Sequence, residues 1–351
     1  MMVKRSLMAA FAVLGASVAT SARAVPLSFT VTGQVGSPTT DTASSLAALP
    51  QATQTVTYRA GGGAVTDTFT GPTLSTVLQA AGGITTNPAN KNDILRRYVV
   101  ATGADGYKVV ISAGEISPRF GNRQDLVATS DTLGQLPSPS GFARIVATGD
   151  VAGGRYLSNL VDLAVLASPA QPGAGGGRSS SIAVQGAVNT PISFTLPSLQ
   201  ALTPYTETVT YLSGTTSVTD TYTGALLWDV LNTVGVRTDP SVKNDVLRKL
   251  VTATGTDGYQ VDFALGELSP SFGNNPILVA YSDTAGTLAT DGFARLVVPG
   301  DLAGGRYVSN LYSLTVFDGT PVPEPASLAV LSLALAGFCL TRRSKAIPQL
   351  A

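Results

Sequence analysis

Asp105-Gly-Tyr107 recurs as Asp257-Gly-Tyr259, 152 positions further along a chain of 351 residues. Words on either side recur at nearly the same displacement: Lys91-Asn-Asp93 as Lys243-Asn-Asp245, Phe120-Gly-Asn122 as Phe272-Gly-Asn274, and Gly153-Gly-Arg-Tyr156 as Gly304-Gly-Arg-Tyr307. A period near 150 residues is far longer than the roughly 20–50 residues of a solenoid repeat. The sequence therefore predicts the tandem duplication of a whole domain.

The repeated words delimit the predicted domains. The first copy covers residues 27–167 and the second residues 180–318. Residues 168–179 between them contain Gly173-Ala-Gly-Gly-Gly177, a composition typical of a flexible linker. The duplication is compatible with two copies packed face to face and equally with two beads on the linker.

Each copy is expected to be α+β and predominantly β, with one principal helix. Apolar residues at helical spacing place that helix at residues 73–81 and 226–234, each followed by a glycine suited to a C-cap. The Asp-Gly pairs predict tight turns between strands, because glycine accepts positive φ angles there. Alternating segments predict the strands, which in the first copy are residues 28–33, 54–58, 67–70, 97–102, 107–112, 126–130, 143–147 and 160–166.

The composition limits the chemistry of the mature chain. Charged residues make up only 13% and balance to a net charge of zero, so no nucleic-acid partner is indicated. The sequence has no histidine, and its only cysteine is Cys339 near the C-terminus. The commonest general base, thiolate metal ligands and disulfides are therefore excluded from the two copies.

The N-terminus has the pattern of a secretory signal peptide. Lys4 and Arg5 precede the apolar residues 7–18, and Ala22 and Ala24 form an A-x-A cleavage signal. The apolar stretch is too short to span a membrane well, which disfavours the alternative of an N-terminal anchor. We expect signal peptidase to remove residues 1–24.

The C-terminus combines three features in a fixed order. Pro323, Glu324 and Pro325 precede an apolar run at residues 326–341, and Arg342 and Arg343 follow it. A core helix is the alternative, but an uncharged run bounded by a proline turn and a basic cluster favours a transmembrane sorting helix.

This tail, residues 322–345, resembles the PEP-CTERM signal that exosortase systems of Gram-negative bacteria recognise. The resemblance implies an exosortase-type sorting enzyme as partner and cleavage near Pro323-Glu324-Pro325. It also implies an intermediate anchored in the inner membrane, and then a place at the cell surface or outside the cell.

The copies themselves resemble the oxidoreductase molybdopterin-binding domain, the sulfite oxidase fold. The second copy carries the resemblance best, in the words Thr223-Gly-Ala-Leu-Leu-Trp228, Gly235-Val236, Thr254-Gly-Thr-Asp-Gly-Tyr259, residues 277–281 and residues 295–301. The resemblance implies a tandem pair of such domains, and molybdopterin as the cofactor to consider.

The resemblance also marks where the cofactor would be held. Catalytic members bind molybdenum through a cysteine, at a place that falls near Ala60 in the first copy and Ser213 in the second. Alanine cannot ligate, and a serine beside a glycine is usually a turn residue. We therefore expect no molybdenum chemistry, no bound metal and no resident cofactor, although the family resemblance keeps molybdopterin as the cofactor to test.

An arginine and a lysine hold the cofactor phosphate in that family. Arg155 and Arg306 match the arginine, whereas the lysine positions read Ser158 and Ser309. Only half of the anion site is therefore present.

Asp150 with Arg155, and Asp301 with Arg306, are the best candidate sites. Glycine-rich backbone beside an arginine suits an anion, while the alternative is an Asp–Arg pair that pins the loop. Both alternatives stay open at the level of sequence.

Three further residues are expected to be structural. Glu115 and Glu267 recur without a second acid or a histidine nearby, which is typical of a helix cap or a surface charge. Trp228 is expected to pack where the principal helix meets the sheet. No catalytic residue is assigned.

The sequence thus predicts an exported, exosortase-sorted protein of the envelope or extracellular matrix. Its two degenerate domains would have a structural or ligand-binding role, with exopolysaccharide or other envelope components as partners. The alternative is a molybdopterin-dependent oxidoreductase with atypical metal ligands, and a third hypothesis is an anion or small-molecule module using Arg155 and Arg306.

Overall fold

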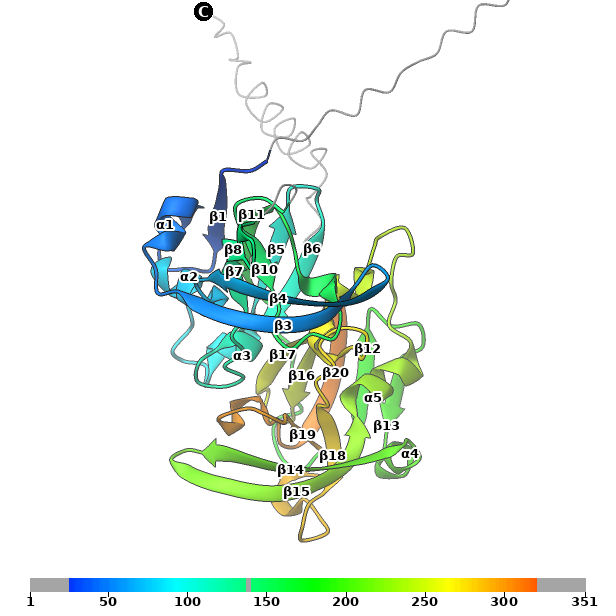
Figure 1. Cartoon of the computed structure of the whole chain (residues 1–351). Helices are drawn as coiled ribbons and strands as arrows, with labels where there is room; N and C mark the ends of the chain where they lie inside the picture. The colour runs from blue at the N-terminus through cyan, green and yellow to red at the C-terminus, as the bar shows by residue number, and fades with distance from the viewer. Residues whose placement is uncertain (1–24, 137–139, 321–351) are drawn as a thin grey trace, which may run out of the picture.

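The computed structural model describes residues 25–136 and 140–320, which form two halves stacked one above the other (Figure 1). The predicted signal peptide, its cleavage residues Ala22 and Ala24, and the sorting tail lie outside the described residues. Within the described ranges, no helix is both long and apolar enough to cross a membrane. The described part is mostly β, as the sequence predicted.

Each half contains a five-stranded mixed sheet with the same order of strands. In the first half the order is β2 (Thr39–Thr42), β1 (Ser28–Gly33), β11 (Leu160–Ala167), β5 (Arg97–Gly103), β6 (Lys108–Ser112). In the second half it is β13 (Ile192–Phe194), β12 (Ile182–Gly186), β20 (Leu311–Asp318), β16 (Lys249–Gly255), β17 (Gln260–Ala264). In both sheets the first strand of the half pairs in parallel with its last strand, β1 with β11 and β12 with β20. The beginning and the end of each half therefore lie side by side in one sheet.

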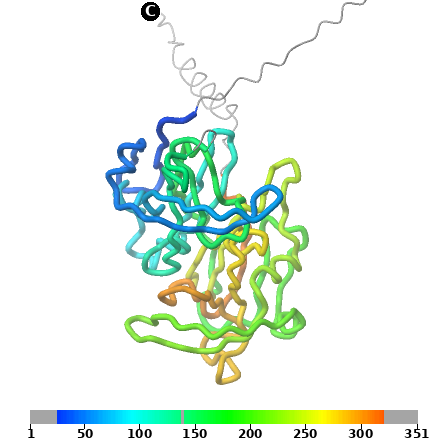
Figure 2. Tube along the Cα trace, viewed as in Figure 1, coloured from blue at the N-terminus to red at the C-terminus, as the bar shows by residue number. Residues whose placement is uncertain are grey.

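A long hairpin crosses each half. The first half has β3 (Ala52–Ala60) with β4 (Gly63–Gly71), extended by β8 (Ser130–Asp131) and β9 (Gly134–Gln135), while β7 (Leu126–Ala128) pairs with β10 (Arg144–Val146). The second half has β14 (Pro204–Ser213), β15 (Thr216–Leu226), β18 (Leu278–Ser282) and β19 (Arg295–Val297) in one sheet. Figure 2 shows the two hairpins crossing the same face of the molecule in opposite directions.

The helices are short. They are α1 (Ala43–Ala47), α2 (Leu74–Ala80), α3 (Ala113–Ile116), α4 (Leu196–Gln200), α5 (Leu227–Val234) and α6 (Leu265–Leu268), with 3-10 turns η1 (Asp93–Arg96), η2 (Gly153–Arg155), η3 (Asp245–Arg248), η4 (Ala289–Asp291) and η5 (Gly304–Arg306). The two principal helices lie where the apolar spacing predicted them. Helix α2 begins after Thr73, whose hydroxyl accepts a hydrogen bond from the Thr76 amide, and α5 ends at Gly235 with φ of 67°.

The hydrophobic cores of the two halves interlock. Leu95 and Phe120 of the first half belong to the core of the second, and Leu247 of the second half belongs to the core of the first. The halves therefore pack face to face, which settles between the two arrangements that the duplication allowed.

Matched polar contacts join the halves across an approximate two-fold axis. Asn92 donates to the Tyr259 hydroxyl at 3.0 Å, and Asn244 donates to the Tyr107 hydroxyl at the same distance. Each tyrosine hydroxyl in turn donates to a carbonyl in its own half, Tyr107 to Gly154 at 2.8 Å and Tyr259 to Gly305 at 2.6 Å. The repeated Asp-Gly-Tyr words thus form the predicted turns, with Gly106 at φ 85°. Their tyrosines also make hydrogen bonds that join the two halves.

The connecting segment, residues 168–179, is held against the second half. The amides of Ala174 and Gly176 both donate to the Thr256 carbonyl at 2.8 Å, and the Thr256 hydroxyl donates to the Gly177 carbonyl at 2.6 Å. Composition predicted a flexible linker, whereas these contacts order its glycine-rich part. The partners come from a strand-to-strand turn remote in sequence, so composition alone does not reveal them.

Candidate functional site

The candidate pair of the first half forms a buried ion-pair cluster. Turn η2 places Arg155 so that its Nε and Nη2 donate to Asp150 at 2.8 and 2.6 Å. Its Nη1 donates to Glu115 at 2.8 Å, and the Arg155 side chain is completely shielded from solvent. Two carboxylates therefore occupy the donors that an anion would need.

The second half repeats this arrangement. Turn η5 places Arg306 so that its Nε and Nη2 donate to Asp301 at 2.8 and 2.6 Å, and its Nη1 donates to Glu267 at 2.6 Å. Arg306 is 2% exposed. The structure thus brings together both pairs that the sequence predicted. Their geometry is that of an Asp–Arg pair that holds the loop, and not that of an open anion site.

Glu115 and Glu267 take a role that the sequence did not suggest. They are 2% and 0% exposed, so the expectation of surface charges is wrong, and their carboxylates bind Arg155 and Arg306 instead of capping a helix. Each partner lies about forty positions away in sequence, which explains why a search among sequence neighbours missed the pairs.

The first cluster has additional members. Arg123 donates to Glu115 and to Asp125, both at 3.0 Å, and also pairs with Asp150. Burial raises the pKa of Asp125 to about 6, although the adjacent arginines oppose this shift. At the position of Arg123 the second half has Asn275, which donates to Glu267 at 3.1 Å. The two halves therefore carry related but unequal charge clusters.

The two clusters meet at the interface. The Ser112 hydroxyl donates across it to Glu267 at 3.3 Å. A side chain at Gly114 would put its Cβ 2.7 Å from the Cδ of Arg306, and one at Gly266 would lie 2.8 Å from the Cδ of Arg155. The aliphatic part of each arginine thus runs over a glycine of the opposite half, so the ion pairs are built into the interface.

The arginines are held in the charged state. Burial works to lower the pKa of Arg306, but the carboxylates of Asp301 and Glu267 outweigh it and raise that pKa. Burial raises the pKa of Glu115, and the charge of Arg155 opposes the shift. An anion could reach either guanidinium only by displacing a carboxylate, which a buried pair resists strongly.

A cleft of about 830 Å³ opens beside the second cluster, between the two halves. Ser213 and Ser309, which the family resemblance placed around a cofactor, both line it, together with Lys91 and Arg119. Its wall includes the stacked rings of Tyr211 and Tyr307, whose centroids are 4.2 Å apart. The structure therefore brings these two serines to one place, while Arg306 faces the interior.

The residues of this cleft do not fit a molybdenum cofactor. Ser213 is exposed near the end of hairpin β14–β15, Ala60 takes the same place on β3–β4, and neither offers a thiolate. In the described ranges, no group of three or more His, Cys, Asp or Glu side chains is arranged to hold a metal ion. The phosphate-binding arginine that the resemblance implies is occupied by carboxylates.

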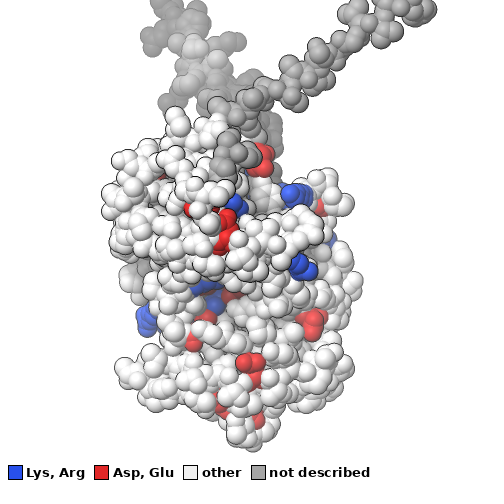
Figure 3. All heavy atoms as spheres, in the orientation of Figure 1, with Lys and Arg blue, Asp and Glu red and all other residues white. Residues whose placement is uncertain are grey.

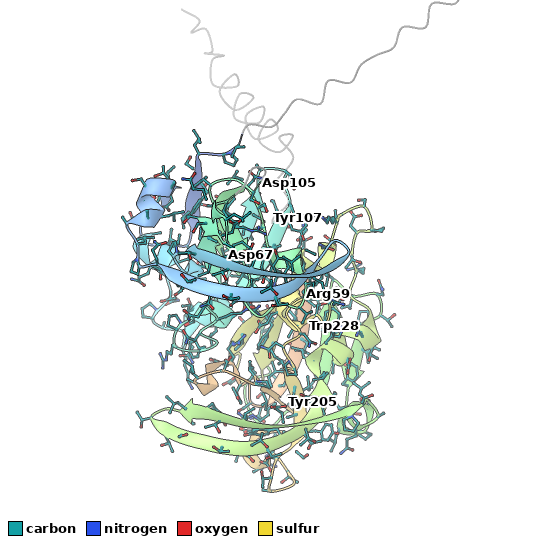
Figure 4. All side chains as sticks on the ribbon, in the orientation of Figure 1. Arg59, Asp67, Asp105, Tyr107, Tyr205 and Trp228 are labelled. Atoms are coloured by element: carbon teal, nitrogen blue, oxygen red, sulfur yellow. The ribbon has the colours of Figure 1, made fainter. Side chains whose placement is uncertain are left out.

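Trp228 lies as the sequence predicted. It is half-buried on α5 and packs against the core of the second half (Figure 4). It is absent from the lining of the 830 Å³ cleft, so packing accounts for it.

Comparison with known proteins identifies the tail. Residues 321–343 match the PEP-CTERM protein-sorting motif. The matched range includes Pro323, Glu324, Pro325, Arg342 and Arg343, the residues on which the sequence prediction rests. The motif supports an exported protein that an exosortase processes at a membrane-anchored step.

Two further comparisons cover the whole chain. The comparison with curated proteins found no match to the chain. The crystal structure of the sulfane dehydrogenase SoxCD from Paracoccus pantotrophus aligns with 84% of this chain and 78% of its own, at 12% identity and a TM-score of 0.33. A match at this level carries no argument about fold or function, so the resemblance to the sulfite oxidase fold stays a prediction.

One buried acid outside the clusters, Asp262, has a pKa that is raised well above its usual value. Asp262 on β17 is fully buried and accepts a hydrogen bond from the Thr252 hydroxyl at 2.7 Å. Burial raises its pKa to about 7, against the effects of that hydrogen bond and of the charges of Arg96 and Arg97. The unfolded chain loses this proton near pH 4, so the contribution of Asp262 to stability is complete below that pH and is lost as pH rises through 7.

Asp262→Asn is therefore expected to raise the free energy of unfolding by about 2 kcal/mol at pH 8, since each unit of pKa shift corresponds to about 1.4 kcal/mol and the amide recovers part of it. At pH 4 the two proteins should be equally stable. Denaturant unfolding of both proteins at pH 4, 6 and 8 measures this difference. A gain that does not change with pH would show that ionisation of Asp262 is not its cause.

Proposed function

We propose that this chain is an exosortase-sorted protein of the envelope or extracellular matrix, whose two halves act as a rigid, non-catalytic structural or ligand-binding unit. The observation that carries the proposal is the combination of the sorting motif at residues 321–343 with the closed ion-pair clusters around Arg155 and Arg306. In this proposal the chain passes through an inner-membrane intermediate and ends at the cell surface or outside the cell.

The clusters support a structural role for both arginines. Each guanidinium binds two carboxylates of its own half while its stem lies on a glycine of the other. The ion pairs fix each arginine within its own half, because breaking them leaves an uncompensated charge in the interior. The arginine stems, held in this way, pack across the interface on Gly114 and Gly266. A rigid pair of domains suits a component that links other surface molecules.

The alternative function is a molybdopterin-dependent oxidoreductase with atypical ligands. The observation in its favour is that Ser213 and Ser309, the positions that the family resemblance marks, line the same cleft. Against it stand the lack of a thiolate outside the sorting tail and the occupied arginines. The proposal therefore includes no resident cofactor.

Metal and pterin analysis of the protein tests this choice. Full-length protein purified from a host that makes the molybdenum cofactor is expected to contain far less than one molybdenum and one pterin per chain. An established molybdopterin enzyme produced in the same host serves as the positive control.

One molybdenum per chain, with pterin fluorescence after oxidation and loss of both in the Ser213→Ala variant, would establish the alternative instead. If the proposal is right, Ser213→Ala changes neither the metal content nor the melting temperature.

A further inference from the structure

The outer faces of the two long hairpins carry the same array of threonines. On β3–β4 three cross-strand pairs of hydroxyls are hydrogen bonded at 2.8–2.9 Å: Thr53 with Thr70, Thr55 with Thr68, and Thr57 with Thr66. On β14–β15 three pairs are bonded at 2.8 Å: Thr206 with Thr223, Thr208 with Thr221, and Thr210 with Thr219. We call each set of six a threonine ladder.

Strand geometry separates each ladder from the core. On β3 the alternate residues Val56 and Tyr58 are buried, whereas Thr53, Thr55 and Thr57 between them are exposed. Successive pairs repeat every two residues, about 6.6–6.8 Å along the strand. Each ladder is therefore a regular row of hydroxyls and methyls. Its threonines are exposed, except for the half-buried Thr68, Thr70, Thr221 and Thr223. Both ladders lie on hairpins that cross the same face of the molecule (Figure 1).

The two copies share the threonines but differ at other outward positions of the same strands. All six threonines occupy equivalent positions in the two hairpins. Exposed positions on the same outer faces differ, since Arg59 corresponds to Leu212 and Ala64 to Ser217. Valine or isoleucine would match threonine in strand propensity, whereas threonine adds the cross-strand hydrogen bonds and keeps the outer faces polar.

The charge of the outer faces indicates a neutral partner. On the side of β3, β4, β14 and β15 that carries the threonines, Arg59 is the one charged residue. The half-buried acids Asp67, Glu207 and Asp220 occupy alternating positions, which face the other side. The acids Asp67 and Asp220 alternate with the threonines and accept hydrogen bonds from Thr132 and Thr284. Figure 3 shows that most of this face is neither acidic nor basic, with a few acidic groups over both hairpins.

We propose that the two threonine ladders bind a neutral, hydroxyl-rich polysaccharide chain lying along the hairpins. The inference deepens the proposed function and rests on it, because an exported envelope protein is the one that meets such polymers. In each threonine pair one hydroxyl proton is used within the pair. The other proton and the free lone pairs remain available to sugar hydroxyls, which are donors and acceptors in the same way.

The methyl groups complete the chemistry. Each threonine presents a methyl beside its hydroxyl, which matches the mixed C–H and O–H surface of a pyranose ring. A strong polyanion would find only Arg59 to pair with on the outer faces, and a polycation would find no carboxylate there. The repeat of three pairs favours a polymer over a single sugar, because each pair adds a small and similar contribution.

Removal of the central hydroxyls tests the ladders. Full-length protein in mild detergent is measured by affinity electrophoresis in gels containing hydroxyethyl cellulose, or alginate as the carboxylated comparison. The quadruple variant Thr55→Val, Thr68→Val, Thr208→Val and Thr221→Val should bind hydroxyethyl cellulose at least tenfold more weakly, since four hydrogen-bonding hydroxyls are lost from the two ladders.

The matched variant replaces the same four residues by serine, which keeps the hydroxyls and removes the methyls. It should bind more weakly than the original protein but at least threefold more tightly than the valine variant. Circular dichroism and melting temperature confirm that both variants fold. Binding that survives the valine changes, retardation by alginate alone, or absence of retardation by both polymers would overturn the inference. Processing of the tail at the membrane, followed in the same variants, reports on the proposed function separately, so that failure of the ladders leaves sorting intact.

Discussion

Arg306→Ala is expected to lower the free energy of unfolding by about 3–5 kcal/mol, because it leaves the buried carboxylates of Asp301 and Glu267 without their counter-charge. For a chain of this size the melting temperature should fall by roughly 10 °C. The measurement is urea unfolding followed by circular dichroism, on the original protein and the variant side by side. The change also removes the arginine stem that packs on Gly114, so the loss includes contacts between the halves.

Two variants make the result specific. Arg59→Ala removes an exposed arginine and should change stability by less than about 0.5 kcal/mol. Joint replacement of Arg306 by Met, Asp301 by Leu and Glu267 by Met removes all three charges, and should recover most of the loss.

The anion hypothesis makes the opposite prediction. It requires that phosphate raise the melting temperature of the original protein, that Arg306→Ala abolish this shift, and that the variant itself stay stable. That combination would replace the ion-pair interpretation of the cluster.

Phe120→Ala is expected to destabilise the protein by about 3–5 kcal/mol, since it empties a site in the core of the opposite half. Phe120 is 2% exposed, and its carbonyl accepts a hydrogen bond from the Leu302 amide at 2.9 Å. The cavity therefore forms where the two halves are joined, and the interface should loosen as well. Urea unfolding measures the first effect, and the rate of proteolysis within residues 168–179 measures the second.

The equivalent residue of the second half supplies the comparison. Phe272 is only half-buried, so Phe272→Ala should cost less than Phe120→Ala. Gly305→Ala is a converse test, because its Cβ would lie 2.1 Å from the Phe120 ring. Equal, small effects from all three variants would mean that Phe120 does not anchor the interface.

Local patterns in the sequence predicted much of the fold. The alternating segments, the two principal helices and the Asp-Gly turns lie close to where the structure has them. The short strands β2 and β13 were missed, because each is defined by pairing with β1 or β12 and not by its own composition. Strand β3 runs over Ala52–Ala60, beyond the predicted residues 54–58, because its partner β4 pairs along the whole length.

The site was predictable only in part. Asp150 and Arg155 are only five residues apart, so their pairing could be predicted from the sequence. The roles of Glu115 and Arg123 were not, because they depend on which turns the fold brings together. The hydrogen bond from Ser112 to Glu267 forms only when the two halves pack together, and no local sequence pattern predicts that packing.

The approximate two-fold axis has a consequence for how this protein can change. In a dimer of identical chains every substitution occurs twice, so a residue near the axis must suit both of its surroundings. Here the two sides are encoded separately, and one side can vary alone. Asp262 occupies the position that Val110 has in the first half, and Arg123 the position of Asn275. Because both halves belong to one chain, the second half can carry a buried acid at Asp262 while the first half keeps the apolar Val110 at the equivalent position. Each half can therefore acquire residues that the other does not need.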